Sequence, residues 1–474
     1  MATSRLLPLV ALVASALLSG CTGSLATTVP LGARDVNAKD PGNLVGLDSG
    51  ALISNKATVG RAGPAMSEAA AAPAMMAPSA RASAAPMAAP APMAPGATVS
   101  ADMTMAPAKV PSQTAGSELR AGAVDDNAKF SDYLKFLKEF DWESADMKPR
   151  KRDVSQRKLV KVLDADGKPV HNADVTVIRP GSDWDGGSSN LSVLYAMRTH
   201  TDGRALFMPQ PEDPIPKDGL YSLHVKAGEN GAIATGTFKL AESDYTIKLP
   251  APVQRVATGV PLDLAIVLDA TSSMSGEIRR FQDTIVSIAE RIRELPQKPK
   301  VRFSLVAYRD QQEAYVTKTT PFTEEIGSFQ RALNDVVAAG GGDKPEDMEA
   351  ALDASLNKLE WNRQAVRLAV LVADAAPHTD YKDAVPYTTS IVRAAQEGIK
   401  FFPIGASGLE SEGEYAMRQI AQGTLGQYLF VTRGGDEASG GGGTASANVD
   451  KFREGRLDLI LVDLVKAELA KLAE

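Results

Sequence analysis

The sequence predicts an α/β fold: a doubly wound, mostly parallel sheet, joined to a smaller all-β sandwich and preceded by a disordered N-terminal tether. Three observations support this. Every Trp, Tyr and Phe lies at Phe130 or later, and a long segment without aromatic residues seldom builds a packed core. Short alternating strands separated by turn residues then run to about residue 250. From residue 258, continuous apolar strands alternate with amphipathic helices, which is typical of a parallel sheet covered on both faces.

The composition excludes several classes of function. The 474 residues carry a net charge of −7, from 51 Lys or Arg and 58 Asp or Glu. This argues against a nucleic-acid binder, because such proteins need a basic surface. A single Cys excludes a disulfide framework, a four-Cys zinc site and an iron–sulfur cluster. The four His residues are too scattered for a His-rich metal site.

Residues 1–21 have the pattern of a secretory signal. Arg5 precedes the apolar stretch Leu6–Leu18, which is too short for a membrane span. The segment ends in the letters LSGC at Cys21 and resembles the lipobox of bacterial lipoproteins. The resemblance implies acyl chains, palmitate among them, on Cys21 and a stable membrane anchor. Thr22, where an Asp would imply the inner membrane, implies the outer membrane; the alternative is a plain secretory signal with an unpaired Cys.

Residues 22–128 are expected to form a disordered tether rich in Ala, Pro and Met. Repeated Pro blocks helix formation, and the lack of large apolar groups blocks a core. We expect a semi-extended segment that holds the folded part away from the bilayer. A Met-rich Cu(I) site is the alternative, but the Met spacing is irregular and no His is nearby.

A short helix and a basic linker are expected over residues 129–157. The helix spans Asp132–Phe140, with its apolar residues on one face. The basic run Lys148–Arg152 follows it. Such runs are usually solvated linkers, and an anionic partner such as lipopolysaccharide is the alternative.

Residues 158–250 predict a small β-sandwich, because short alternating strands are separated by frequent turn residues. The expected strands are 158–163, 174–178, 204–207, 221–225 and 245–249. The phrase over 162–177 resembles the carboxypeptidase-regulatory-like sandwich. His171, His200 and His224 have no ligand-like spacing. We therefore expect a spacer or an auxiliary binding module.

Residues 258–474 predict the mostly parallel sheet. Apolar residues from Ile278 to Leu295 recur at steps of three and four, which indicates a helix with one buried face. The expected strands are 264–268, 301–308, 314–317 at an edge, 366–373, 399–404 and 427–431, and the expected helices are 278–295, 324–337, 345–359, 383–397, 412–422 and one from about 449. Such sheets place their sites at the carboxyl ends of the strands.

Polar residues occupy those strand ends. Asp269, Thr271 and Ser273 follow the first strand, and Asp374 follows a later one. Together with a glycine-rich loop that ends at Asp343, they resemble the metal-ion-dependent adhesion site (MIDAS) of the von Willebrand factor A domain. The resemblance covers the whole C-terminal domain and implies a metal held by these residues.

The chemistry of these residues independently fits a small, hard cation. Mg²⁺ takes six oxygen ligands in octahedral geometry. Alternate residues of an extended loop point the same way, so Asp269, Thr271 and Ser273 can converge on one point. Hydroxyls add ligands without charge, so the metal stays electrophilic and can accept a carboxylate from a partner. Mn²⁺ can replace Mg²⁺, and Ca²⁺ fits less well because the site has few ligand groups.

Two interpretations stay open for Asp343. As the ligand from the third loop, it would contact the metal directly or through water. Alternatively, Asp343 and Glu346 have the capping-box spacing for a helix that begins near Lys344.

The sequence offers little for catalysis. His378 lies near Asp374, but no Ser or Cys nucleophile with a matching base is evident. Asp310 and Glu277 are candidates for the rim of the metal site. We therefore expect no enzyme, and a metal-dependent hydrolase is the alternative from a different class.

The expected function is adhesion-like, metal-dependent binding of a protein ligand that presents an acidic residue, by a protein held to the membrane through its lipid. The alternative is a structural or assembly factor in an envelope complex, in which metal only stabilises the fold. By resemblance to relatives, movement of the terminal helix couples to occupancy of the site. The expected apolar face of that helix is Leu457, Leu461, Val465, Leu469 and Leu472.

Overall fold

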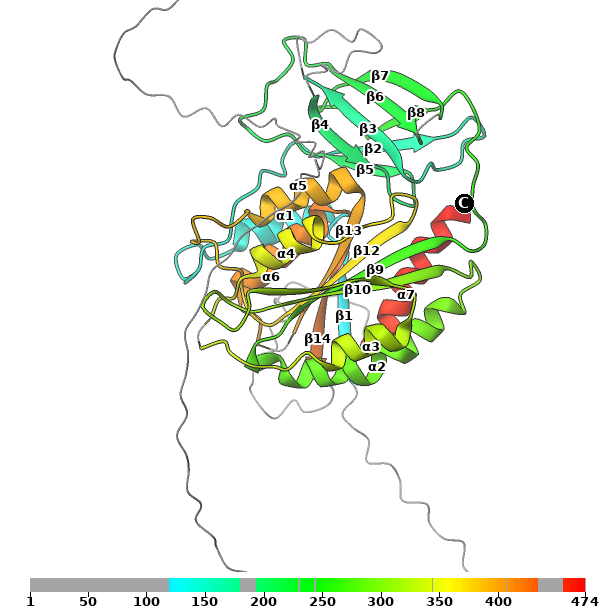
Figure 1. Ribbon diagram of the computed structural model, residues 1–474. Helices are drawn as coiled ribbons and strands as arrows, with labels where there is room; N and C mark the ends of the chain where they lie inside the picture. The colour runs from blue at the N-terminus through cyan, green and yellow to red at the C-terminus, as the bar shows by residue number, and fades with distance from the viewer. Residues whose placement is uncertain are drawn as a thin grey trace, which may run out of the picture. The chain divides into compact units, whose positions relative to one another are not determined.

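A computed structural model describes most of the chain after residue 118 (Figure 1). The described ranges are 119–179, 193–228, 231–242, 244–342, 344–406, 408–433 and 455–473. The predicted signal, Cys21, most of the predicted tether and Asp343 lie outside them. The chain divides into two compact units, and all described residues belong to the second, Thr104–Glu474.

One large sheet organises the C-terminal part of the chain. Within the described residues it has eight strands in the order β11-β10-β9-β12-β13-β14-β1-β15. Their bounds are β1 (Leu119–Val124), β9 (Pro261–Asp269), β10 (Lys300–Tyr308), β11 (Thr317–Thr323), β12 (Val366–Ala373), β13 (Ile399–Gly405), β14 (Tyr428–Arg433) and β15 (Gly455–Arg456). The run from β10 to β14 is parallel, and β11, β1 and β15 pair antiparallel. The predicted mostly parallel sheet is confirmed.

Helices cover both faces of this sheet (Figure 1). On one face lie α2 (Ser275–Arg293), α3 (Ile326–Asn334) and α7 (Leu457–Ala470), and on the other lie α4 (Met348–Asn357), α5 (Tyr387–Glu397) and α6 (Ser411–Gly423). Two 3₁₀ turns, η1 (Ser272–Met274) and η2 (Lys471–Ala473), flank α2 and α7. Each layer has its own apolar core against the sheet, which is why β12 is buried along its whole length. None of the helices in the described ranges is both long and apolar enough to cross a bilayer.

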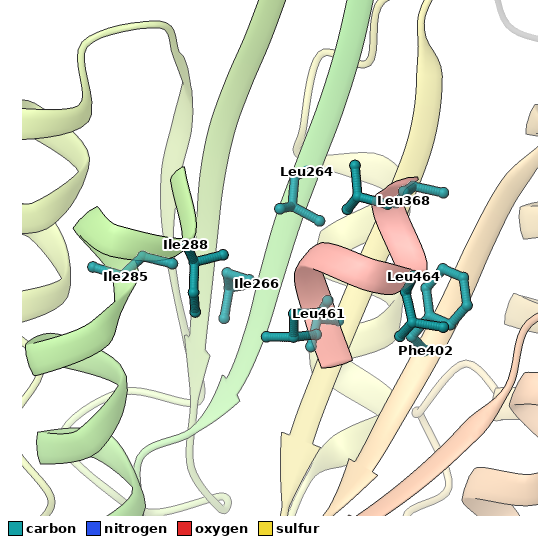
Figure 2. Close-up of a pocket in the computed structure, with 10 residues that line it drawn as sticks. Leu264, Ile266, Ile285, Ile288, Leu368, Phe402, Leu461 and Leu464 are labelled. Atoms are coloured by element: carbon teal, nitrogen blue, oxygen red, sulfur yellow. The ribbon is translucent and has the colours of Figure 1, made fainter. Parts of the chain in front are cut away.

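The α7 helix closes one core. Its residues Leu461, Val465 and Leu469 are buried, as the sequence predicts. In Figure 2, Leu461 lies over the sheet near Ile266, and with Ile288 of α2 the two residues line a small apolar cavity. The predicted face of α2 is also buried from Ile278 to Leu295, so α2 and α7 pack side by side through matching stripes.

A small β domain is inserted between β1 and β9. Its strands are β2 (Lys158–Leu163), β3 (Ala173–Ile178), β4 (Val193–Arg198), β5 (Arg204–Phe207), β6 (Tyr221–Ala227), β7 (Ile233–Phe238) and β8 (Tyr245–Lys248). In the described residues they form sheets of order β5-β2-β8 and β4-β3-β6-β7, which share one apolar core. The resemblance to the carboxypeptidase-regulatory-like family stays a prediction.

The prediction that the tether extends to residue 128 is wrong. Residues 119–124 form β1, which pairs antiparallel with β14, for example Ala121 with Val431. The backbone of β1 supplies the ladder, so the strand needs no aromatic or strongly apolar signal of its own. The large sheet therefore begins before the inserted small β domain, and not at residue 258.

The prediction that the basic run Lys148–Arg152 is a solvated linker is also wrong. Arg150 donates from Nε and Nη2 to the fully buried carboxylate of Glu349, at 2.5 and 2.7 Å. Arg152 is buried and donates to the hydroxyl of Tyr195 at 3.0 Å. The preceding helix α1 (Phe130–Glu139) packs its aromatic side chains near Tyr415 of α6. Buried acceptors thus bind two Arg residues of the basic run, although its charge alone predicted that it would be exposed to solvent.

The end of α7 contacts the small β domain through a buried ion cluster. Glu468 of α7 accepts from the hydroxyl of Thr201 at 2.7 Å and from Nζ of Lys400 at 2.8 Å. All three side chains are buried. The small β domain is therefore bound to the helix layer by paired groups in addition to its chain connections.

Candidate metal centre

The candidate centre lies at the carboxyl ends of three neighbouring strands. Asp269 is the last residue of β9, and parallel pairing sets Tyr308, the last residue of β10, beside it. Asp374 follows the last residue of β12, which pairs with β9 on its other side. The strand order therefore brings together residues that are distant in the sequence.

Four predicted residues form one chain of hydrogen bonds. The hydroxyl of Thr271 donates to Oδ1 of Asp269 at 2.7 Å, and the Thr271 amide donates to the same oxygen at 3.0 Å. The hydroxyls of Thr271 and Ser273 lie 3.3 Å apart. Ser273 donates to Oδ1 of Asp374 at 3.0 Å. The structure thus brings Asp269, Thr271, Ser273 and Asp374 together, as predicted.

Burial leaves one carboxylate oxygen of this cluster without a partner. Asp269 is fully buried, and its Oδ2 has no hydrogen-bond partner among the described residues. Burial raises the pKa of the Asp269 carboxyl to about 7, and it raises the pKa of Asp374 as well. Ser273, by contrast, is exposed, so the cluster opens to solvent on that side.

This donor set fits a hard divalent cation. Two carboxylates and two hydroxyls offer only oxygen, which Mg²⁺ and Mn²⁺ prefer. A cation against Oδ2 of Asp269 would remove the cost of burying that oxygen unpaired. In the described ranges, no group of three or more His, Cys, Asp or Glu side chains is arranged to hold a metal. Any cation here would therefore be held with few protein charges.

A glycine-rich loop closes the site from the side. Gly341 adopts φ +71°, and a Cβ there would lie 2.9 Å from Cβ of Thr271 and 2.8 Å from Oε1 of Glu346. Nearby, Ser272 donates to the carbonyl of Gly340 at 2.7 Å. Only glycine lets this loop approach Thr271 so closely.

Replacing Gly341 with Ala is therefore expected to lower the free energy of unfolding by about 1–3 kcal/mol and to weaken Mg²⁺ binding, because Thr271 must move. Gly342→Ala is the matched control, since a Cβ at Gly342 meets nothing within 4 Å. Urea unfolding and calorimetric Mg²⁺ titration measure the two effects. Equal behaviour of the two variants would show that the loop does not position Thr271.

The helix expected to begin near Lys344 begins later than predicted, and Asp343 itself lies outside the described residues. The helix α4 begins at Met348, and Asp347 caps it by accepting from the amide of Ala350 at 2.9 Å. Residue Glu346 is instead bridged to Pro377, in the loop after Asp374. This extended pairing delays the start of the helix.

Sequence reasoning missed Glu346 and Tyr308 as neighbours of the site. Glu346 is buried and lies beside Thr271, as the space around Gly341 shows. Tyr308 is fully buried, and burial raises the pKa of its hydroxyl well above the usual range, with the Asp269 charge adding to the effect. The signal for Tyr308 was present, because it ends the strand that neighbours β9.

A second polar cluster forms the rim. The hydroxyl of Tyr381 donates to both oxygens of Asp310, at 2.7 and 2.9 Å. The ring of His378 stacks on Tyr381 with 4.1 Å between centroids, and its Nδ1 lies 2.7 Å from Asp380. These contacts draw the loop after β12 across to the end of β10. Asp310 and His378 therefore belong to the rim, while Glu277 lies in the first turn of α2.

Comparisons with known proteins match part of this chain. Residues 263–395 match the family model of the von Willebrand factor A domain. The chain is similar to the alpha-protein kinase vwkA of Dictyostelium discoideum, with 28% identity over 145 residues, which are 30% of this chain and 23% of the kinase. The chain thus spans about a quarter of the length of that relative.

Two solved structures are also similar. BatB from Bacteroides thetaiotaomicron has 14% identity and a TM-score of 0.31, with 45% of this chain and 99% of BatB covered. Proximal thread matrix protein 1 from the mussel byssus, solved with zinc in its MIDAS motif, has 15% identity and a TM-score of 0.26, with 35% and 46% covered. The family match spans the strands and loops that carry Asp269, Thr271, Ser273 and Asp374, and this chain therefore contains a von Willebrand factor A domain.

Proposed function

We propose that this chain is a lipid-anchored protein of the bacterial cell envelope whose A domain binds a protein partner through a divalent cation. Asp269, Thr271, Ser273 and Asp374 would hold the cation, with Mg²⁺ first, Mn²⁺ as a substitute and Ca²⁺ less suited. The observation that carries the proposal is the buried Oδ2 of Asp269, which has no hydrogen-bond partner in the described ranges.

The balance of charge explains how such a site captures a ligand. The two carboxylates neutralise the ion, while the hydroxyls of Thr271 and Ser273 add oxygen ligands without further charge. A cation bound in this way remains a good Lewis acid for one more carboxylate. Ser273 marks the side from which an acidic side chain of a partner can approach, because it is the exposed member of the cluster.

The anchor and the lack of catalysis are parts of the same proposal. The LSGC sequence ending at Cys21 supports lipidation, and Thr22 supports the outer membrane. The rim His378 already bonds Asp380, and no Ser or Cys nucleophile lies beside it in the described rim contacts. We therefore propose a binding protein and not a hydrolase.

Capture from detergent-solubilised envelope extract tests this function. The full chain with a C-terminal tag is expected to retain a specific partner in Mg²⁺ and to lose it in EDTA. The Asp269→Ala variant should capture at least tenfold less of the partner. Ser273→Ala should lose a large part of it without loss of stability, because Ser273 is exposed. Glu290→Gln, at an exposed position on α2, is the control and should capture normally.

The competing role is a structural or assembly factor whose metal only stabilises the fold. The raised pKa of Asp269 supports this competing role, because a cation would stabilise the folded state even without a partner. Capture that survives both EDTA and Ser273→Ala would support this role and contradict metal-mediated binding.

A further inference from the structure

The candidate centre lies where the parallel strands of the large sheet end, and this carboxyl-terminal edge of the sheet is acidic. We call it the acidic edge. Five loops form it: 269–277, 309–314, 339–347, 374–383 and 406–412. Their described residues include eleven Asp or Glu and three Lys or Arg, a net charge of −8. By sequence, these loops therefore carry about as much net negative charge as the whole chain, which has −7.

Three cations belong to these loops, and two of them are exposed. Arg309 is buried and donates to the carbonyls of Ala270 and Val337, at 3.2 and 2.8 Å. Lys344 is exposed; it donates to the carbonyl of Gly408 at 2.8 Å and pairs with Glu410 at 3.5 Å. Lys382 is exposed as well. Carboxylates outnumber cations among the described residues of these loops, so an approaching ligand meets a net negative charge.

Several of these carboxylates lie at the surface around the centre. The side chain of Asp380 is 59% exposed and that of Glu410 is 48% exposed, and Asp383 is exposed as well. They lie on two loops that follow β12 and β13. A single divalent cation would cancel only two of the eight net negative charges, so the edge stays negative when the centre is loaded.

Two polar atoms at this edge lack hydrogen-bond partners among the described residues. One is Oδ2 of Asp269, which is fully buried, and the other is Nε2 of His378, whose side chain is 10% exposed. Nε2 of His378 points toward Asp310, at 3.7 Å from its Oδ2. The buried, unpartnered oxygen of Asp269 distinguishes this edge from an ordinary solvated acidic surface.

We propose that the partner presents its metal-binding carboxylate from a basic surface, with Lys or Arg side chains flanking the acidic residue. This rests on the proposed function and specifies its partner. An acidic residue among neutral or acidic neighbours would be repelled by the edge before it reached the cation. Flanking cations would be attracted by Asp383 and by Asp380 and Glu410, which already contact His378 and Lys344, and would speed association through the long-range field.

Selection from a displayed library of random peptides, with the full chain and Mg²⁺, tests the proposal. Wild-type protein is expected to select EDTA-sensitive peptides in which one Asp or Glu is flanked by Lys or Arg. The variant D380N/D383N/E410Q should lose this basic preference, and the peptides selected by wild type should associate with it roughly tenfold more slowly at low salt. The control E212Q/E242Q/E290Q removes three exposed carboxylates from the small β domain and α2, and it should keep the preference.

Each other outcome has a distinct meaning. Mg²⁺-dependent peptides with neutral or acidic flanks would overturn the basic partner while the proposed function stands. No Mg²⁺-dependent peptide from wild-type protein would overturn both. A variant that unfolds is recognised by its thermal melt, and the single variants D383N and E410Q then carry the comparison of rates.

Discussion

Replacing Asp126 with Ala is expected to lower the free energy of unfolding by about 3 kcal/mol. Asp126 accepts from Nη2 and Nε of Arg418 at 2.6 and 2.9 Å, and both side chains are at least 96% buried. Without Asp126, Arg418 still pairs with Glu414, 3.3 Å from Nη1, and still lies over the ring of Phe136, 3.7 Å from its centroid. Breaking a buried pair by removing one partner typically costs 3–5 kcal/mol, and the remaining contacts set the expectation near the lower end. Urea unfolding measures the change.

Asp132→Ala is the matched control. It removes an ion pair with Lys135 at 3.5 Å in which both side chains are more than half exposed, so the expected cost is at most about 0.5 kcal/mol. The double variant D126A/R418M should recover part of the loss, because it leaves no buried charge unpaired. Equal losses from Asp126→Ala and Asp132→Ala would mean that the segment before the small β domain contributes little to the fold.

The parallel sheet could be predicted because its local signals are strong. The strand expected at 366–373 has these bounds in the structure, since a strand buried on both faces is apolar throughout. The buried face of the helix α2 could be predicted from the spacing of Ile278, Phe281 and Ile285. Both patterns lie within one short window of sequence, so they can be read without knowledge of the partners.

Elements that depend on distant partners could not be predicted. The strand β1 is recognisable only through its pairing with β14, about three hundred residues later. Arg150 and Arg152 looked solvated because nothing nearby shows that Glu349 is buried and within reach. The predicted boundary at residue 258 therefore leaves out β1 and the segment containing α1, which packs near α6.

The candidate centre was predictable where strand ends carry it. Asp269 and Asp374 follow apolar strands, and the parallel order alone brings such ends together. The start of α4 was not predictable in the same way, because the bridge of Glu346 to Pro377 holds the backbone extended before the cap at Asp347. A capping pattern in the sequence does not show whether a neighbouring loop competes for the backbone.

Without metal, raising the pH from 5 to 8 is expected to lower the free energy of unfolding by roughly 3 kcal/mol through Asp269 alone. Burial raises the pKa of this carboxyl from 3.8 to about 7, so the folded state holds a proton that the unfolded chain has released. Stability from this group is complete below about pH 4 and is lost as the pH rises through 7. Burial also raises the pKa of Asp374, which acts in the same direction.

The comparison of wild type with Asp269→Asn in EDTA isolates this effect. Burial lowers the pKa of His171 to about 4 and that of His200 well below its usual value, and these groups destabilise the fold as the pH falls below 6.5. Both proteins share that contribution, so the difference between their urea midpoints reports Asp269. The difference should grow in favour of Asp269→Asn as the pH rises, and Mg²⁺ should reverse it, because a cation replaces the proton on the buried carboxylate. Parallel pH profiles would mean that Oδ2 of Asp269 is already satisfied in the metal-free protein, and the main argument for a cation at this position would be lost.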